Sequence, residues 1–293
     1  MKIEVPIVNA FTDGPLGGNP AGVVLDAERF TRDQKQRIAA TVGVSETAFV
    51  SPSGNADFML EFFTPTRQIA HCGHATVATF NYLNQIGKLT KPHASKETID
   101  GCREIRLENN QAYMEQLAPR YQTLSEKHQA QLLQGLGLRG DELLSGAAPL
   151  VVNTGNSFVV LGVTDAATLA KLSADRAIIT ELSDALDLIG VYVFTLDTRE
   201  AGRHASTRMF APRYGIDEEA ATGMAAGPMA CYLHDQLVIR EDSYLIEQGQ
   251  FMHFPSPSVI EVRLKTGSDA AILGLMVGGS AAVSETRLIE IAD

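Results

Sequence analysis

Glu46 is the most conspicuous candidate for chemistry, because it stands in the apolar, strand-like segment 44–50, which reads VSETAFV. Carboxylates are seldom fully buried among apolar residues. Burial raises the pKa of a carboxyl group toward values that suit proton transfer. The sequence therefore predicts a general acid/base at Glu46, although the same pattern also fits an edge-strand glutamate that faces water.

A second group of reactive side chains occupies residues 71–74, which read HCGH. Gly73 is expected to begin a helix, and the positive end of the helix dipole would keep His74 neutral, as a polar hydrogen-bonding partner. His71, Cys72 and His74 could in principle hold a metal, but no fourth ligand stands at a convincing spacing, and we expect no metal. A thiolate nucleophile at Cys72, with His71 or His74 as its base, is an alternative.

Two helices that open on glycine are candidate anion-binding elements. Gly73 begins one small-residue helix that ends in Tyr82-Leu83, and Gly223 begins another that ends in Tyr232-Leu233. Unpaired N–H groups and the dipole at a helix N-terminus attract anions. Both helices could thus hold a carboxylate substrate, or they could simply be small-residue helices packed closely in each core.

These two helices belong to a longer internal repeat. Phe63-Thr64-Pro65 precedes the first helix, and Phe210-Ala211-Pro212 precedes the second. Further upstream, residues 18–25 (GNPAGVVL) resemble residues 155–161 (GNSFVVL). Because the two pairs occur in the same order, we interpret the chain as a duplication.

The duplication leaves the candidate acid without a counterpart. Aligning Phe49 with Phe194 places Val191 opposite Glu46. A racemase with two facing thiols is also disfavoured, because the position that corresponds to Cys72 carries an alanine or a threonine. An acid that occurs in only one of two similar halves is not explained by the shared fold, which favours a functional role for Glu46.

Capping and turn signals predict the elements that carry these residues. Thr31 has capping-box spacing to Gln34, and Gly43 can end the helix that follows. Thr164 or Asp165 can cap a helix that runs into the 170s. The predicted strands are 44–50, 149–152, 157–163, 188–196, 250–254, 259–264 and 272–291. Pro255-Ser256-Pro257 separates 250–254 from 259–264, and Gly278-Gly279 divides the segment 272–291.

Composition narrows the class of protein. The 293 residues carry a net charge of −11, which argues against nucleic acid and anionic membranes as partners. No apolar run approaches the roughly 18 residues of a membrane span, and residues 1–6 do not resemble a signal peptide. The three cysteines are far apart in sequence, so we expect reduced thiols and a cytoplasmic location.

Taken together, the motifs resemble the phenazine-biosynthesis isomerase (PhzF-like) family, within the diaminopimelate-epimerase-like superfamily. The matching segments cover almost the whole chain in order: 9–12 (NAFT), 18–21 (GNPA), 44–49 (VSETAF), 62–65 (FFTP), 72–76 (CGHAT), 215–216 (GI), 222–223 (TG), 248–249 (QG) and 278–279 (GG).

The resemblance implies an α+β fold of two pseudo-symmetric lobes, each a mostly antiparallel sheet wrapped around a central helix, with the active site between them. The lobes would comprise residues 1–118 and 119–280, and the last strand, about 281–293, could return to the first lobe. The resemblance also implies a homodimer that uses no metal or organic cofactor.

For the site, the resemblance implies proton-transfer isomerisation of a small carboxylate, with Glu46 as acid/base and His74 as the family's active-site histidine. Glu219 takes the place of the family's usual aspartate and is the third candidate catalytic residue. The candidate substrate-binding residues are Asn19, Ser45, Cys72, Gly73, Thr222, Gly223 and Met224.

The segment 215–225 (GIDEEAATGMA) departs from the family's usual pattern. Ala220 replaces a proline, Met224 replaces a serine, and Gln68 stands where the first half usually carries an acid. These changes predict a substrate other than the phenazine precursor. They also leave open a protein of another class, a non-catalytic paralogue that binds small acids.

Overall fold

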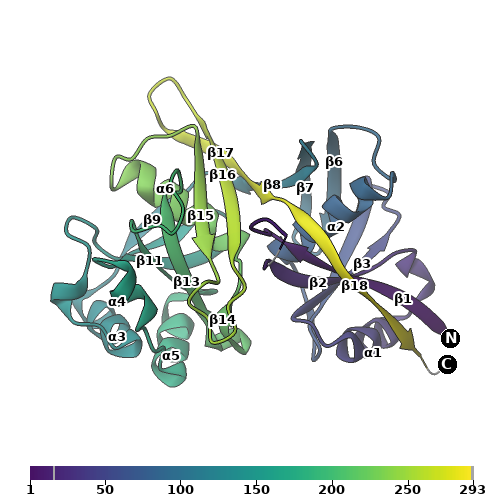
Figure 1. The fold of residues 1–293 in the computed structure, drawn as a ribbon, viewed down its shortest axis with the longest axis horizontal. Helices are drawn as coiled ribbons and strands as arrows, with labels where there is room; N and C mark the ends of the chain where they lie inside the picture. Colours follow the sequence, from purple (N-terminus) through teal and green to yellow (C-terminus); the bar gives the residue numbers. More distant parts are fainter. Residues whose placement is uncertain (16, 292–293) are drawn as a thin grey trace. The chain divides into compact units, whose positions relative to one another are not determined.

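The computed structural model describes residues 1–15 and 17–291, which divide into two compact units. Unit 1 comprises Met1–Glu115 together with the chain from Gly278 onward, and unit 2 comprises Gln116–Val277. Strands dominate both units, with few helices (Figure 1). The predicted α+β class is confirmed.

Unit 1 is built on one mixed sheet, in which the β2–β3 and β4–β6 pairs are parallel and the β18–β1, β1–β2, β3–β4, β6–β7 and β7–β8 pairs are antiparallel. The last strand of the chain, β18, lies antiparallel to the first strand, β1. In spatial order, the strands are β18 (Ala281–Glu290), β1 (Lys2–Ala10), β2 (Asn19–Val24), β3 (Glu46–Ser51), β4 (Phe58–Phe63), β6 (His93–Thr98), β7 (Gly101–Glu108) and β8 (Gln111–Leu117), with β5 (Gln68–Ile69) beside β4.

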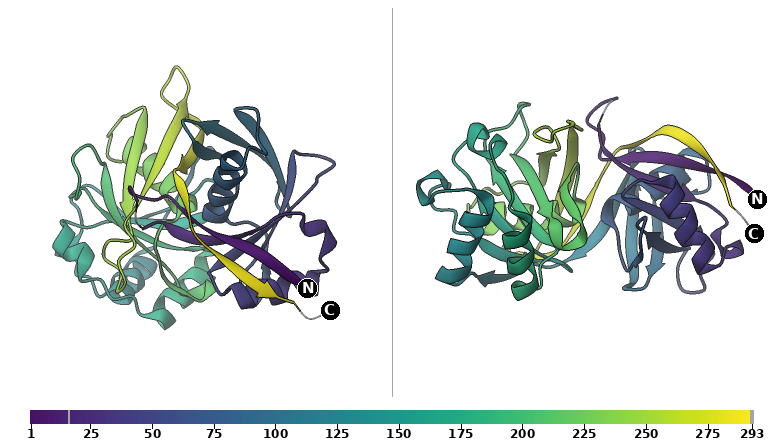
Figure 2. Two further views of the ribbon diagram at one scale, coloured as in Figure 1. Left: turned by 45° about the vertical axis from the view of Figure 1, so that its right-hand side comes forward. Right: turned by 90° about the horizontal axis from the view of Figure 1, so that it is seen from below.

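Helix α2 (Gly73–Gln85) is the central helix of this sheet, and it packs against β1, β2, β3, β7 and β18 (Figure 2). All of its residues from Gly73 to Asn81 are buried. A helix covered on every side needs small side chains where strands approach closely, which explains its richness in alanine and threonine.

Helix α1 (Arg32–Val42) lies on the other face of the sheet, where Ile38 and Val42 share a core with Phe49 of β3. Its ends are as predicted. Thr31 and Gln34 form the capping box, and Gly43 ends the helix with a φ of 71°.

Unit 2 repeats the arrangement of unit 1. Its sheet pairs β9 (Arg120–Thr123), β10 (Leu150–Asn153), β11 (Ser157–Gly162), β12 (Gly190–Thr195), β13 (Ala205–Ala211), β15 (Ser243–Gln248) and β16 (Ser258–Thr266), with β14 (Ile216–Glu219) beside β13. The β11–β12 and β13–β15 pairs are parallel, as at the corresponding places of unit 1. The central helix is α6 (Gly223–Asp235), which agrees with a duplicated fold.

The strand register corrects the alignment of the two halves by one residue. Glu46 pairs with Ala21, the fourth residue of the first GN repeat segment, whereas Phe158, the fourth residue of the second, pairs with Gly190. The structural counterpart of Glu46 is therefore Gly190 and not Val191. A Cβ atom at Gly190 would lie 2.5 Å from a backbone oxygen of Phe210, so unit 2 has no room for a side chain there.

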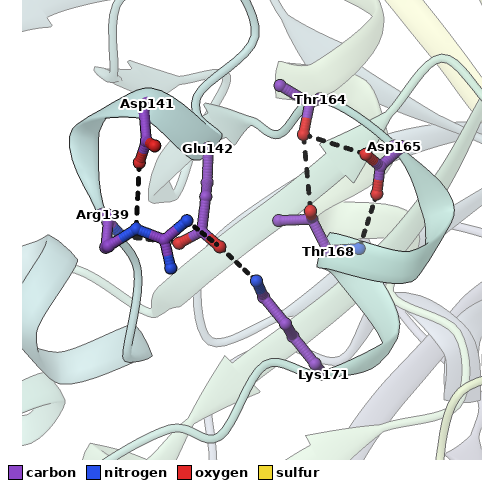
Figure 3. A network of polar contacts seen from close by, with 7 residues as sticks. All are labelled: Arg139, Asp141, Glu142, Thr164, Asp165, Thr168 and Lys171. Atoms are coloured by element: carbon purple, nitrogen blue, oxygen red, sulfur yellow. Dashed lines mark hydrogen bonds and ion pairs between the residues drawn. The ribbon is translucent and has the colours of Figure 1, made fainter.

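The helix capped by Asp165 is shorter than predicted. Asp165 accepts a hydrogen bond from the backbone N–H of Thr168 and begins α4 (Ala166–Ala170), which ends at the first residue of the 170s (Figure 3). Lys171, at the end of α4, forms an ion pair with the buried Glu142. A separate helix, α5 (Arg176–Leu186), follows and packs against α3 (Glu126–Leu136).

Two predicted strand boundaries are also wrong. Residues 250–254 form a turn, because Gly249 adopts a φ of 84° and its carbonyl accepts a hydrogen bond from the N–H of Ser256. Strand β17 (Ile272–Gly279) continues through the two glycines, and Ser280 separates it from β18. A Cβ atom at Gly278 would lie 2.2 Å from the oxygen of Ala112, so that glycine permits close strand contact.

Among the described residues, no helix combines the length and the apolar character required to cross a membrane.

Candidate active site

Glu46 is the first residue of β3, and its side chain is buried, with 5% of the residue exposed. Side chains alternate between the two faces of a strand. Phe49 packs on the α1 face, so Glu46 lies on the opposite face, toward α2. The edge-strand alternative is therefore wrong, since β3 pairs on both sides and all its residues are buried.

His74, in the first turn of α2, connects Glu46 with Cys72. Its Nε2 atom lies 3.3 Å from Oε2 of Glu46, and its Nδ1 atom lies 3.5 Å from Sγ of Cys72. The imidazole is 4% exposed and the carboxylate side chain 7%. Thiol, imidazole and carboxylate thus stand in the order of a nucleophile–base–acid triad.

Burial opposes a thiolate in this arrangement. It raises the pKa of the Cys72 thiol, an effect that the neighbouring His74 only partly offsets. Reactive cysteines are those whose pKa is lowered, so the thiol is better suited to donate or accept a weak hydrogen bond. His74 is the imidazole beside this thiol, whereas His71 has its Nδ1 atom next to Nζ of Lys96.

The same three side chains are the residues that could hold a metal. One ligand atom from each of Glu46, Cys72 and His74 lies within 4.8 Å of the others. Three protein ligands match the number in a catalytic zinc site. A zinc-bound thiol must be deprotonated, so zinc binding here would release the proton of Cys72.

The other two predicted residues of unit 1 differ in their exposure. Asn19 begins β2, is 4% exposed, and stands two residues before Ala21, the partner of Glu46. Asn19 and Glu46 therefore lie on the same face of the sheet. Ser45 is exposed in the bend that precedes β3.

The start of α2 presents backbone N–H groups without a side-chain cap. Cys72 is the N-cap residue, and its side chain makes no capping hydrogen bond. The N-cap of α6, Thr222, likewise does not cap its helix. First-turn N–H groups of this kind bind anions in proteins.

In unit 2, the predicted residues gather around Gln248, which the sequence indicated only as part of a family signature. Gln248 is fully buried, and its Oε1 atom accepts hydrogen bonds from the backbone N–H of Thr222 (3.0 Å) and from the Tyr192 hydroxyl (2.9 Å). Its Nε2 atom donates to the carbonyl of Glu219 and to Oγ1 of Thr222. This amide fixes the loop before α6.

Glu219 and Met224 are each held by a neighbour in the same unit. The Thr222 hydroxyl donates a 2.5 Å hydrogen bond to Oε2 of Glu219. Nε2 of Gln116 lies 3.0 Å from the carbonyl of Gly223 and 3.7 Å from the sulfur of Met224. The Glu219–Met224 segment is thus ordered by polar side chains.

Lys96 is a polar residue near the site that the sequence analysis missed. It is fully buried on β6, with Nζ 3.1 Å from Nδ1 of His71 and 2.7 Å from Oγ1 of Thr76. The signal was the alternation in residues 94–98, where Ala94, Lys96 and Thr98 occupy the inward positions. A lysine at an inward position of a strand is rare.

Comparison with known proteins identifies the family of this chain. A family model described as phenazine biosynthesis-like protein matches residues 8–287. The chain belongs to this family. The solved structure of a PhzF-family phenazine biosynthesis protein from Bacillus anthracis has 28% sequence identity and a TM-score of 0.90, covering 99% of this chain and 100% of that one.

Named isomerases are among the relatives. An uncharacterised isomerase of Deinococcus radiodurans is 35% identical over 287 residues, covering 94% of this chain and 91% of the relative. The trans-2,3-dihydro-3-hydroxyanthranilate isomerase of Pseudomonas aeruginosa is 30% identical over 290 residues, covering 96% and 97%. The predicted enzyme class is therefore confirmed, and this protein is an isomerase of the family.

Proposed function

We propose that this protein isomerises or epimerises a small carboxylate substrate by moving a proton, without a metal or an organic cofactor. The observation that carries the proposal is the buried pair of Glu46 and His74 at the uncapped N-terminus of α2. A relative that acts on a dihydro-hydroxyanthranilate, which is itself a carboxylate, supports the substrate class.

Glu46 is the group that takes up and returns the proton. Its carboxylate is the only acidic side chain among the donor groups gathered at the described start of α2. Its burial on the α2 side of β3 limits solvent access. General acid–base transfer by such a positioned group typically contributes about 10²–10⁴-fold in rate.

His74 orients the carboxylate and supplies a hydrogen-bonding group beside the transferred proton. Its two nitrogen atoms are directed to Glu46 and to Cys72. At a helix N-terminus the dipole disfavours a positive charge on the imidazole. A neutral ring has one N–H and one acceptor nitrogen, so it can face both neighbours and orient the carboxylate without changing its own protonation state.

The N–H groups in the first turn of α2 are the proposed carboxylate-binding element. Gly73 is buried and contributes no side chain, so a ligand can approach the backbone closely. An anion at this position gains both hydrogen bonds and the favourable helix dipole. This arrangement suits an acidic protein that must still bind an anionic substrate.

The decisive experiment measures deuterium incorporation. Wild-type protein in deuterated buffer is incubated with trans-2,3-dihydro-3-hydroxyanthranilate and with a panel of small unsaturated and α-amino carboxylates, and exchange at the α or allylic carbon is followed by NMR. An isomerase incorporates deuterium into at least one of these compounds. A protein that only binds acids produces chemical-shift changes without exchange.

Glu46→Gln then tests the assignment of the acid/base. The variant keeps nearly the same shape, so substrate binding should persist while exchange falls about 10²-fold or more. Glu61→Gln is the matched control, because it removes another carboxylate of unit 1, one that is partly buried and pairs with Lys35. Normal exchange by Glu46→Gln would show that Glu46 is not the acid/base.

A further inference from the structure

Lys96 lies beside the start of α2, although it is on β6, the strand that follows the other end of that helix. Strand β6 pairs with β4 on one side and with β7 on the other, which places Lys96 in the interior of the sheet. The lysine is fully buried, and its Nζ atom lies 5.5 Å from the centre of the Phe62 ring.

The amine of Lys96 begins a chain of hydrogen bonds that ends at the N-cap of α2. Nζ donates to Oγ1 of Thr76 at 2.7 Å, and that hydroxyl donates its single proton to the carbonyl of Cys72 at 2.6 Å. The backbone N–H of Thr76 donates to the same carbonyl at 3.2 Å. Lys96 thereby orients the hydroxyl that fixes the Cys72 peptide.

A second contact of the same amine holds the residue before the N-cap. Nζ of Lys96 lies 3.1 Å from Nδ1 of His71. The pKa of His71 is held well below its ordinary value, first by burial and then by the charges of Lys96 and Arg103. A neutral His71 can accept at Nδ1 and carry its proton on Nε2, which matches an amine donor.

The two contacts of Lys96 hold the His71–Cys72 corner, the stretch of backbone that leads into α2. Cys72 is extended (φ −145°, ψ 120°), and its side chain gives no cap. Residues 70–72 lie in no helix or strand. Two residues after Cys72 stands His74, whose nitrogen must meet Glu46, so a displacement of the corner would move the imidazole away from the carboxylate.

Burying an amine here is costly, and a structural role alone does not require it. Methionine would fill a similar volume among apolar neighbours without a desolvation penalty. Burial is the main reason that the pKa of Lys96 falls to about 7, and the charge of Arg103 lowers it further. Cys72 and Asp100 act in the opposite direction and raise the pKa. Proteins keep such unfavourable groups chiefly where function needs them.

We propose that Lys96 is a positioning residue of the active site, which holds the His71–Cys72 corner through its two hydrogen bonds and so sets His74 against Glu46. The proposal rests on the function assigned above to Glu46 and His74. Lys96 does not itself contact the reacting atoms.

Three variants separate positioning from general packing. Lys96→Met removes both hydrogen bonds, and Thr76→Val removes only the link to Cys72 while preserving shape. Thr76→Ser retains the hydroxyl and should restore wild-type behaviour. Lys88→Met is the matched control, because Lys88 is exposed and lies just beyond the other end of α2.

The first measurement needs no substrate. Imidazole nitrogen and carbon shifts report the protonation and surroundings of His71 and His74, and backbone amide shifts report Gly73. We expect Lys96→Met and Thr76→Val to change the signals of Gly73 and His74. Only Lys96→Met should also raise the pKa of His71, and neither Thr76→Ser nor Lys88→Met should alter any of them.

The second measurement is the rate of deuterium exchange with the substrate found for the wild type. A misplacement near 1 Å can cost about 100-fold in rate, so we expect kcat to fall about 10–100-fold in Lys96→Met and Thr76→Val, with KM changing less than about threefold. The exchange rate of the wild type, plotted against pH, should also show a step near pH 7, where Lys96 titrates. The same plot for Lys96→Met should lack this step.

The outcomes are distinguishable from a failure of the proposed function. If the wild type exchanges no substrate, the proposed function fails, while the His74 and Gly73 shifts still test Lys96. If Lys96→Met does not fold, Thr76→Val and Thr76→Ser decide the question. Unchanged shifts and unchanged kcat in a folded Lys96→Met or in Thr76→Val would overturn the proposal.

Discussion

Replacing Lys96 with methionine should change how the stability of unit 1 depends on pH. The pKa of Lys96 falls from its ordinary value of 10.5 to about 7, mainly through burial. One pKa unit corresponds to about 1.4 kcal/mol. Below pH 7, the buried ammonium therefore costs the folded state about 5 kcal/mol relative to an unfolded chain in which it is fully solvated.

The sign follows from proton uptake. Between pH 7 and 10.5, the folded protein has mostly lost the proton of Lys96, whereas the unfolded chain still binds it. Unfolding thus takes up a proton in this range, and a rise in pH favours the folded state. The penalty is complete below pH 7, and it is relieved as the pH approaches 10.5.

The expected magnitude is obtained by comparing two pH values. From pH 6 to pH 9, the free energy of unfolding of the wild type should rise by about 3 kcal/mol more than that of Lys96→Met. At pH 6, Lys96→Met should be the more stable protein, because the lost hydrogen bonds contribute only about 1 kcal/mol each.

Urea titration at pH 6 and at pH 9 measures this difference. Hydrogen exchange of β6 and β7 provides the readout, since both strands belong to unit 1 and the two units need not unfold together. Lys88→Met, which removes an exposed lysine, should parallel the wild type at both pH values. Equal pH dependence of the wild type and Lys96→Met, within about 0.5 kcal/mol, would refute the reasoning.

Four further outcomes are expected. Cys72→Ala should retain exchange within about threefold, as the buried thiol is not a nucleophile; a loss of 100-fold would restore the triad alternative. Dialysis against a chelator should leave turnover unchanged, and activity regained on adding zinc would contradict this. Gln248→Leu should lower unfolding free energy by about 1–3 kcal/mol, because the buried Thr222 N–H loses its acceptor; a neutral result in thermal unfolding would argue against that role. Met224→Ser combined with Glu219→Asp should tighten binding of a hydroxyanthranilate analogue in calorimetry, because the thioether is a poor hydrogen-bonding group; equal affinity would show that these positions do not set specificity.

Features with a local cause could be predicted from the sequence. The capping box at Thr31 and the glycine at 43 place the first helix to within a residue, because a cap depends only on side chains three or four positions away. The two repeated segments predicted a duplicated α+β fold, since similar sequences form similar local elements. The distinctive acid at Glu46 was evident from its apolar neighbours.

Features that depend on pairing between distant segments were not predictable in this way. Whether Glu46 corresponds to Gly190 or to Val191 is a matter of strand register, and a one-residue difference reverses the face of every side chain. Residues 250–254 were predicted as a strand because they are rich in apolar residues, but they form a turn that the backbone conformation of Gly249 permits.

The sequence by itself determined the family, the helix caps and the chemical identity of Glu46 and His74. Only the tertiary structure brought Nε2 of His74 to 3.3 Å from the carboxylate and placed Lys96 behind the same corner. The physical reason is that helix-capping residues and hydrophobic periodicity describe one helix or strand at a time. Parallel pairing of β4 with β6 sets Lys96 beside Phe58, a residue from before α2 in the chain, and such pairing between separate elements selects which buried polar groups meet.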